Sequence, residues 1–160
     1  MILMPKWLYW LRRKARPLSR LLHFFLLNSY YLEGPDTKLQ FGSRCSFNNA
    51  IFNTSSGNIL IDDNVIFGYN VMVLTGVHNF VGGKRVGLST DLTSAGLLEV
   101  PTDGHDIKIG EGSWIASGSI LIGGSSVGKH SIVAAGSVVT KQFGDHLLIG
   151  GSPAKIIRTI

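Results

Sequence analysis

His78 is the side chain in this sequence that is best placed for acid–base chemistry. It ends the segment Thr75–His78, and the long stretch that follows it, 79–106, shows no repeating pattern. Imidazole accepts or donates a proton near neutral pH, and loops of this length inside a compact domain are usually functional. The alternative is a solvated loop histidine without a role. We therefore treat His78 as a candidate proton acceptor at the root of a substrate-binding loop.

The elements that position His78 are predicted by a period of six on both sides of this loop. A bulky apolar residue holds the first position of each hexad: Phe41, Phe47, Ile61, Phe67, Val73, Ile109, Ile115, Leu121, Val127, Val133 and Val139. The fifth position is usually small or β-branched, as at Cys45, Val65 and Ser113. Short strands that turn repeatedly in one sense would stack the first positions into one interior. The period thus predicts a parallel β-solenoid and leaves its hand open.

Composition and charge restrict the class of protein further. The chain has 160 residues, of which 44% are apolar and 16% charged, so it can bury one core and is not disordered. Residues 1–32 hold six Lys or Arg and no acid, whereas residues 33–160 hold nine basic and ten acidic residues. Because the body is nearly neutral, we expect no binding to nucleic acid. Cys45, the single cysteine, cannot form an internal disulfide, which suits a cytoplasmic protein.

Residues 1–33 are predicted to form a basic, amphipathic helical segment. Its most apolar run, Leu21–Leu27, is far shorter than the roughly 20 residues that span a bilayer. Two compatible interpretations remain open. The helices could cap the open end of the solenoid, or they could bind an anionic membrane surface through their cations and through Trp7, Tyr9 and Trp10. The second interpretation would place the protein at the inner face of the membrane.

Three motifs carry a resemblance to a known family. GSWIASGSI (Gly112–Ile120), VAAGSVVTK (Val133–Lys141) and GGSPAKIIR (Gly150–Arg158) resemble the hexapeptide-repeat acyltransferases, in particular the galactoside and maltose O-acetyltransferases and the O-acetyltransferases of polysaccharide biosynthesis. The resemblance implies a mainly β protein, a left-handed parallel β-helix with three hexads per coil and therefore about four coils. It would occupy residues 34–160, with a loop insertion at 79–106.

The same resemblance implies roles for two residues of a catalytic site. His78 would be the general base that takes the proton of an acceptor hydroxyl. Asn48 lies thirty residues earlier and would bind the acceptor or the developing oxyanion through its amide. Asn49 is its neighbour, and the alternative for either asparagine is a corner residue that supplies a tight turn.

The resemblance also implies that the co-substrate is acetyl-CoA and that no metal is required. The pantetheine arm would lie beside Trp114, Ser117 and Ala135. Cations near the carboxy-terminus would meet the phosphates of the nucleotide. The residues expected at that end are Thr140, Lys141, Lys155 and Arg158.

The predicted activity is acetyl transfer to a hydroxyl of a sugar, glycolipid or polysaccharide precursor. Family active sites lie between neighbouring prisms, so the resemblance implies a homotrimer with a CoA tunnel between subunits. Two alternatives stay open: an N-acetyltransferase that acts on an amino sugar, and a non-catalytic β-helical scaffold.

Overall fold

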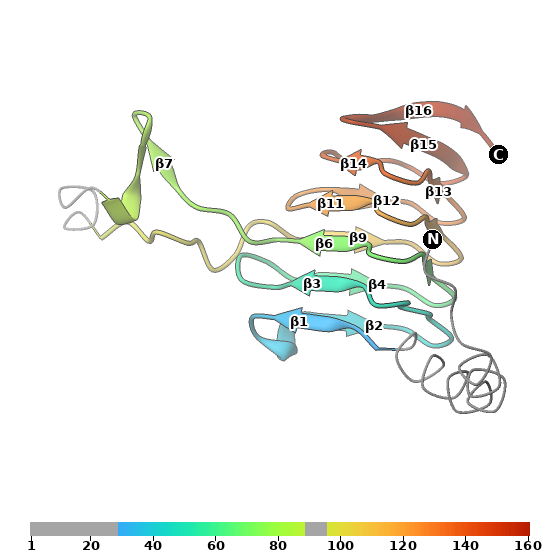
Figure 1. The fold of residues 1–160 in the computed structure, drawn as a ribbon, viewed down its shortest axis with the longest axis horizontal. Coiled ribbons are helices and arrows are strands. Elements are labelled where there is room, and N and C mark those ends of the chain that lie inside the picture. The colour runs from blue at the N-terminus through green and yellow to red at the C-terminus, as the bar shows by residue number, and fades with distance from the viewer. Residues whose placement is uncertain (1–28, 89–95) are drawn as a thin grey trace, which may run out of the picture.

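The chain folds into a stack of coils with three flat faces, in a computed structural model that describes residues 29–88 and 96–160 (Figure 1). Face A contains β1 (Tyr31–Glu33), β3 (Ile51–Asn53), β6 (Met72–Leu74), β11 (Ile120–Ile122) and β14 (Val138–Val139). Face B contains β2 (Leu39–Phe41), β4 (Ile59–Ile61), β9 (Ile107–Ile109) and β12 (Ser126–Val127). Face C contains β5 (Ile66–Phe67), β10 (Trp114–Ile115), β13 (Ile132–Val133), β15 (Leu147–Gly151) and β16 (Ala154–Thr159).

Strands of successive coils pair in parallel at a fixed spacing. In the upper coils, Trp114 lies opposite Ile132 and Ile120 lies opposite Val138, so each partner stands three hexads further along the chain. Three hexads per coil therefore hold there as predicted. β15 and β16 depart from the pattern and pair antiparallel, which closes the carboxy-terminal end of face C. In the described part of the chain face A carries five strands and face B carries four, in keeping with the prediction of about four coils.

The first strand of face A, β1, is formed by residues that carry no readable hexad. Tyr31, Leu32 and Glu33 pair with Ile51, Phe52 and Asn53, and η1 (Asp36–Lys38) precedes β2. The prediction of helix for residues 1–33 is therefore wrong for Tyr31–Glu33, because their backbone groups are used by the β3 edge. Residues 1–28, with the rest of the predicted helical segment, lie outside the described residues. No helix within the ranges described is long and apolar enough to cross a membrane.

The first-position side chains fill the interior, as the hexads predicted. All of them from Phe47 onward have at most 7% of their surface exposed, whereas Phe41 is 46% exposed because it belongs to the first coil. The fifth-position serines are also buried, and those other than Ser125 hydrogen-bond to backbone groups at the corners. Ser113 Oγ donates to the carbonyl of Gly128 at 2.7 Å and accepts from the N–H of Ser131 at 3.1 Å. A small hydroxyl at this position therefore links one coil to the next.

The insertion leaves face A after β6 and returns to face B at β9 (Figure 1). It contains a hairpin, β7 (Phe80–Val81) paired with β8 (Lys84–Arg85), followed by η2 (Val86–Leu88). Figure 1 shows this hairpin projecting sideways from the coils. Ile59 still pairs with Ile107, so the coils above and below the insertion keep their register.

Substitution of an inward residue should cost far more stability than substitution of its outward neighbour. Ile109 is 1% exposed in β9, while Lys108 in the same strand faces solvent. Ile109→Ala should lower the free energy of unfolding by about 2–5 kcal/mol, because it leaves a cavity between coils. Lys108→Ala should change it by about 0.5 kcal/mol or less. Urea unfolding measures both, and equal effects of the two variants would contradict the assignment of inward and outward positions.

Candidate active site

The direction in which the chain leaves the coils at His78 is fixed by hydrogen bonds around Thr75. Thr75 is fully buried directly after β6, and its hydroxyl donates to the carbonyl of Asn53 at 2.9 Å. The same oxygen accepts from the N–H of Ser56 at 3.1 Å, and Ser56 Oγ accepts from the N–H of Val77 at 3.3 Å. The root of the insertion is therefore anchored to the coil below it, directly before His78.

The His78 ring is half-exposed and lies beside a carboxylate. Its Nδ1 lies 3.4 Å from Oε1 of Glu99, which comes from the far end of the insertion. The side chain of His78 is 52% exposed. Because Nδ1 faces Glu99, the Nε2 edge is the part of the ring turned away from that carboxylate. An imidazole in this arrangement can take a proton through Nε2 from a group that approaches from outside the insertion.

Glu99 was not identified from the sequence. It stands in a stretch without hexads or a known motif, far from His78 along the chain, and only the folding of the insertion brings the two together. Its carboxylate also lies 3.4 Å from Nε of Arg85, and its backbone carbonyl accepts from the N–H of Asn79 at 2.8 Å. The sequence contained only a weak signal for Glu99, namely that it is an acidic residue in the loop that begins at His78.

Asn48 lies at a corner, with its amide engaged within its own chain. The residue has a positive φ of 42°, and Nδ2 donates to the carbonyl of Phe67 at 2.7 Å. Asn49 has a φ of 59° and exchanges two hydrogen bonds with Asn70 in the next coil. Both asparagines thus occupy left-handed turn positions, as the alternative interpretation holds. A binding role for Asn48 would add to this structural one.

Asn48 and His78 are not brought together within one chain. Asn48 precedes β3, at the edge where face C passes into face A, which we name the CA edge. His78 follows β6, at the edge where face A passes into face B, which we name the AB edge. The strands of face A run between these two edges, so the two predicted catalytic residues stand on opposite sides of that face.

The residues expected to bind CoA divide between the same edges. Ser117 and Ala135 both lie at the CA edge, one full coil apart, and Ser117 Oγ accepts from the N–H of Tyr69 at 3.0 Å. Trp114 stands nearby on face C, 48% exposed between Ile66 and Ile132. The cations expected at the nucleotide end are exposed on β16 of the same face, namely Lys155 and Arg158.

Thr140 and Lys141 form the second part of this set. They follow β14 and are exposed at the AB edge, the edge that also carries His78. Lys141 Nζ lies 5.4 Å from the centre of the Phe143 ring. One chain therefore presents the candidate base and two polar residues along one edge, and the expected pantetheine contacts along another.

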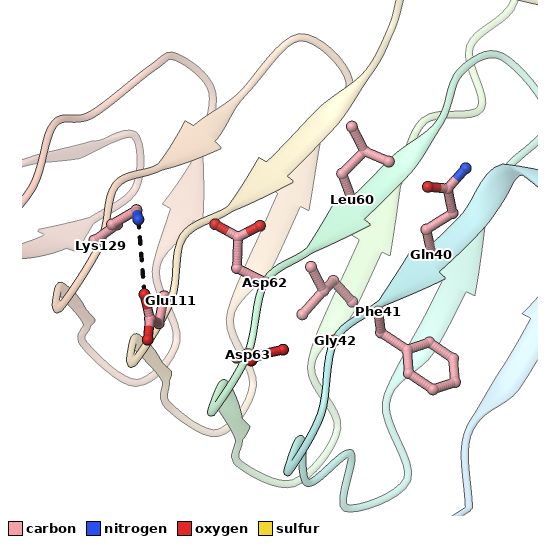
Figure 2. Close-up of a pocket in the computed structure, with 9 residues that line it drawn as sticks. Gln40, Phe41, Gly42, Leu60, Asp62, Asp63, Glu111 and Lys129 are labelled. Carbon is pink, nitrogen blue, oxygen red and sulfur yellow. Dashed lines mark ion pairs between the residues drawn. The ribbon is translucent and has the colours of Figure 1, made fainter.

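A groove on face B carries acidic residues but none of the predicted site residues (Figure 2). It is lined by Gln40, Phe41, Leu60, Asp62, Asp63 and Glu111, among others. Two of its carboxylates serve the fold. Asp63 Oδ1 accepts from the N–H of Ser43 at 2.7 Å, and Glu111 pairs with Lys129 at 3.6 Å, the dashed contact in Figure 2. We therefore place the candidate active site at the insertion and not in this groove.

The histidines other than His78 take different positions. His105 gives its backbone N–H to the carbonyl of Ser56 at 3.2 Å, at the end of the insertion. His130 stacks on His146 with ring centres 5.4 Å apart, at corners where both residues have positive φ. Within residues 29–88 and 96–160, no group of three or more His, Cys, Asp or Glu side chains could hold a metal ion.

Comparison with known proteins finds a family model that matches part of the chain. Residues 106–141 match the bacterial transferase hexapeptide (six repeats) family. The galactoside O-acetyltransferase of Lactococcus lactis is 27% identical over 85% of the chain. The chain spans only 60% of the length of that relative.

Two solved structures have the same fold as this chain. A galactoside acetyltransferase in complex with coenzyme A has a TM-score of 0.63 and 20% identity, and the match covers 92% of this chain and 81% of that one. A hexapeptide-repeat acetyltransferase of Vibrio cholerae complexed with acetyl-CoA has a TM-score of 0.51 and 23% identity, over 90% and 77% of the two chains. The predicted fold is confirmed: this is a left-handed parallel β-helix of hexapeptide repeats.

Removal of the Thr75 hydroxyl should loosen the root of the insertion. In Thr75→Val the shape of the side chain is kept, but the buried N–H of Ser56 loses its acceptor. We expect a loss of about 1–3 kcal/mol in the free energy of unfolding and faster hydrogen exchange at the Ser56 amide. Thr37→Val, at an exposed position of the first coil, is the matched control. Unchanged exchange at Ser56 would show that this hydrogen bond does not anchor the insertion.

Proposed function

We propose that this protein is an acetyl-CoA-dependent O-acetyltransferase that acts on a hydroxyl of a sugar or of a polysaccharide precursor. The observation that carries the proposal is the His78 ring at the root of the insertion, with Nδ1 against Glu99 at 3.4 Å and half of its surface exposed. The name of the L. lactis relative, a galactoside O-acetyltransferase, supports a sugar hydroxyl as acceptor. The acetyl-CoA in the complex of the Vibrio cholerae acetyltransferase supports the donor.

The proposed reaction is a direct transfer with His78 as general base. Nε2 of His78 takes the proton of the acceptor hydroxyl while that oxygen attacks the carbonyl carbon of the thioester. The tetrahedral intermediate then expels the CoA sulfur, so that a C–O bond replaces the C–S bond. The proton on His78 passes to the thiolate, which leaves as free CoA. No enzyme nucleophile is needed, and Cys45, packed against the core with Sγ near the carbonyl of Asp62 at 3.2 Å, is not placed to act as one.

The proposed assembly is a homotrimer in which each active site lies between two chains. The division of the predicted residues between the AB and CA edges supports this assembly. If the AB edge of one chain faces the CA edge of its neighbour, His78 meets the neighbour's Asn48 and pantetheine contacts. In this arrangement Trp114, Ser117 and Ala135 would line the arm of CoA. The residues towards its phosphates would be Thr140, Lys141, Lys155 and Arg158.

The outward side chains of the three faces also support assembly through faces A and C. Large apolar side chains are exposed on both: Tyr31 and Ile122 on face A, and Ile66 and Trp114 on face C. Face B instead presents polar side chains to solvent, at Gln40, Lys108 and Gln142. Exposed apolar patches of this kind mark surfaces that bind other proteins. A polar face B would then remain on the outside of the trimer.

For the acceptor we propose a chemical class and not an individual compound. A hydroxyl of a sugar, a glycolipid or a polysaccharide precursor fits the direct transfer, and an amino sugar would use the same base with an amine as attacking group. A cytoplasmic location, with residues 1–32 at the inner face of the membrane, would bring the enzyme to a lipid-linked precursor. That location and the membrane contact stay predictions from the sequence.

Loss of the proposed base should abolish most of the turnover. With a panel of sugars and glycolipids as acceptors, the wild-type protein should release free thiol from acetyl-CoA. His78→Ala should lower kcat by about 10²–10⁴-fold, with little change in the KM for acetyl-CoA. His146→Asn, which keeps a residue that tolerates positive φ, is the control. A wild-type protein that releases no thiol with any acceptor would favour the non-catalytic scaffold instead.

Hybrid trimers test whether the active site is shared between chains. His78→Ala and Asn48→Gly should each be nearly inactive, and glycine at position 48 keeps the positive φ. Equal co-expression of the two variants should restore about a quarter of the wild-type activity, because random mixing pairs an intact His78 with an intact neighbouring Asn48 at that frequency. Activity that stays at the level of the separate variants would place both residues in a site within one chain, or remove Asn48 from it.

A further inference from the structure

We propose that Tyr69 is a catalytic residue of the shared active site. Its phenol hydroxyl donates a hydrogen bond to the thioester carbonyl oxygen of acetyl-CoA and to the oxyanion that forms from it. This inference rests on the proposed function and on the proposed homotrimer, because it assigns Tyr69 to a site that is completed by His78 of a neighbouring chain. Tyr69 was not identified from the sequence, and only its place in the coils brings it to this site.

Tyr69 belongs to the column of predicted site residues along the CA edge. Met72 pairs with Ile51 in the coil below and with Ile120 in the coil above. Ile120 in turn pairs with Val138. The residues three places before these four therefore share one position at the CA edge, and they are Asn48, Tyr69, Ser117 and Ala135. Tyr69 thus lies between the residue predicted to bind the acceptor and the two predicted to contact pantetheine.

The backbone of Tyr69 is fixed against the coil above it. Its N–H donates to Ser117 Oγ at 3.0 Å, and its carbonyl accepts from the N–H of Gly118 at 2.8 Å. Gly68 permits this close approach, because a β-carbon at position 68 would overlap the backbone nitrogen and Oγ of Ser117. The base of the Tyr69 side chain is therefore held beside a residue that is proposed to contact pantetheine.

The side chain of Tyr69 is free of partners in the described part of the chain. It is 45% exposed, and within residues 29–88 and 96–160 it has no hydrogen bond or ring contact. Asn48, by contrast, donates from Nδ2 to the carbonyl of Phe67 at 2.7 Å. Because the amide of Asn48 is engaged at its own corner, the phenol hydroxyl is the better donor for the oxyanion, and Asn48 is left to bind the acceptor.

Tyr69 and His78 belong to the same coil. Tyr69 precedes β6 at the CA edge, and His78 follows β6 at the AB edge. Three chains around a threefold axis parallel to the prism keep equivalent coils at equal height. Where the AB edge of one chain faces the CA edge of its neighbour, His78 is level with the neighbour's Tyr69, whereas the neighbour's Asn48 lies one coil lower. The reacting carbonyl must be level with the base, so Tyr69 is the donor placed to reach it.

The hydroxyl of Tyr69 would act where negative charge develops. As the acceptor oxygen attacks, the electron pair of the C=O double bond moves onto the carbonyl oxygen, and the phenol O–H donates to the oxyanion so formed. When the C–S bond breaks, this electron pair restores the C=O double bond of the new ester. Tyr69 keeps its proton throughout, since the proton that His78 takes from the acceptor passes to the thiolate. Donors aimed at such an oxyanion stabilise the transition state more than the ground state.

The alternative is that Tyr69 only fills space between neighbouring chains. Tyrosine rings supply contact area in many interfaces, and this role does not need the hydroxyl. Tyr69→Phe separates the two roles because it keeps the ring and removes only the hydroxyl. Tyr30→Phe makes the same chemical change at the amino-terminal end of the prism, where the Tyr30 ring packs edge-on against Phe41 and Phe47. It is therefore the matched control.

The decisive measurement is the infrared stretch of the thioester carbonyl, observed with ¹³C-carbonyl acetyl-CoA bound to the full-length protein without an acceptor. A hydrogen bond to the carbonyl oxygen weakens the C=O bond and lowers the frequency of its stretch. We expect the frequency to be lower in the wild type than in Tyr69→Phe, and unchanged in Tyr30→Phe. Equal frequencies in the wild type and Tyr69→Phe overturn the proposal. A wild-type protein that binds no acetyl-CoA overturns both this proposal and the proposed function.

Turnover supplies a second and separable result. Tyr69→Phe should lower kcat by about 10²–10³-fold, the loss that follows removal of one oxyanion donor, with the KM for acetyl-CoA nearly unchanged. Equal co-expression of Tyr69→Phe with His78→Ala should restore about a quarter of the wild-type activity, because the hydroxyl serves the base of a neighbouring chain. No recovery in the mixture would contradict that placement. A carbonyl frequency that depends on Tyr69 in a protein without turnover would support Tyr69 and count against the proposed acceptor alone.

Discussion

The register between successive coils is the constraint on which the rest of this structure depends. In the regular coils each strand finds its partner three hexads further along, as Lys108 does with Ser126, and this spacing places every first-position side chain over the one below. Backbone hydrogen bonds and apolar contact therefore come from the same repeat. A shift of a single position in the spacing would turn an entire strand over and expose what is now buried. This register therefore sets the positions of the faces and edges of the prism, and of the insertion that leaves from one edge.

A chain held by such a register can carry a long insertion at a corner without loss of the core. Ile59 of β4 pairs directly with Ile107 of β9, although the whole insertion lies between them in sequence, and later partners are again three hexads apart. The inserted segment leaves and re-enters between β6 and β9, where the chain turns from face A to face B. Where the insertion leaves the coils, the N–H of Ser56 donates to the hydroxyl of Thr75 and so links two successive coils. The sequence of the insertion can therefore vary without disturbing the core, because the coils supply the stability.

The sequence predicted those parts of the molecule in which equivalent positions recur in the same environment. The hexads identified the buried first positions from Phe47 onward and the corners between them, because each position recurs with the same environment. The strand Tyr31–Glu33 was missed, because these residues pair with β3 through their backbone but carry no six-residue pattern. Glu99 was missed because the insertion folds through individual contacts that leave no period. The separation of Asn48 from His78 was also unreadable, because a spacing along the chain does not reveal which edge a residue occupies.

The closed core of the prism explains why the candidate site lies at edges. Inward positions are filled by Leu121, Val133 and their neighbours, so a substrate has no access to the interior. Outward positions on a flat face offer contact area but little enclosure. A reaction between two substrates requires a base, a binding surface for the donor and exclusion of water, and these need surfaces that converge. In a single chain the edges of His78 and Ser117 diverge from one another, because the width of face A lies between them. In the homotrimer proposed above, a neighbouring chain would supply the second surface.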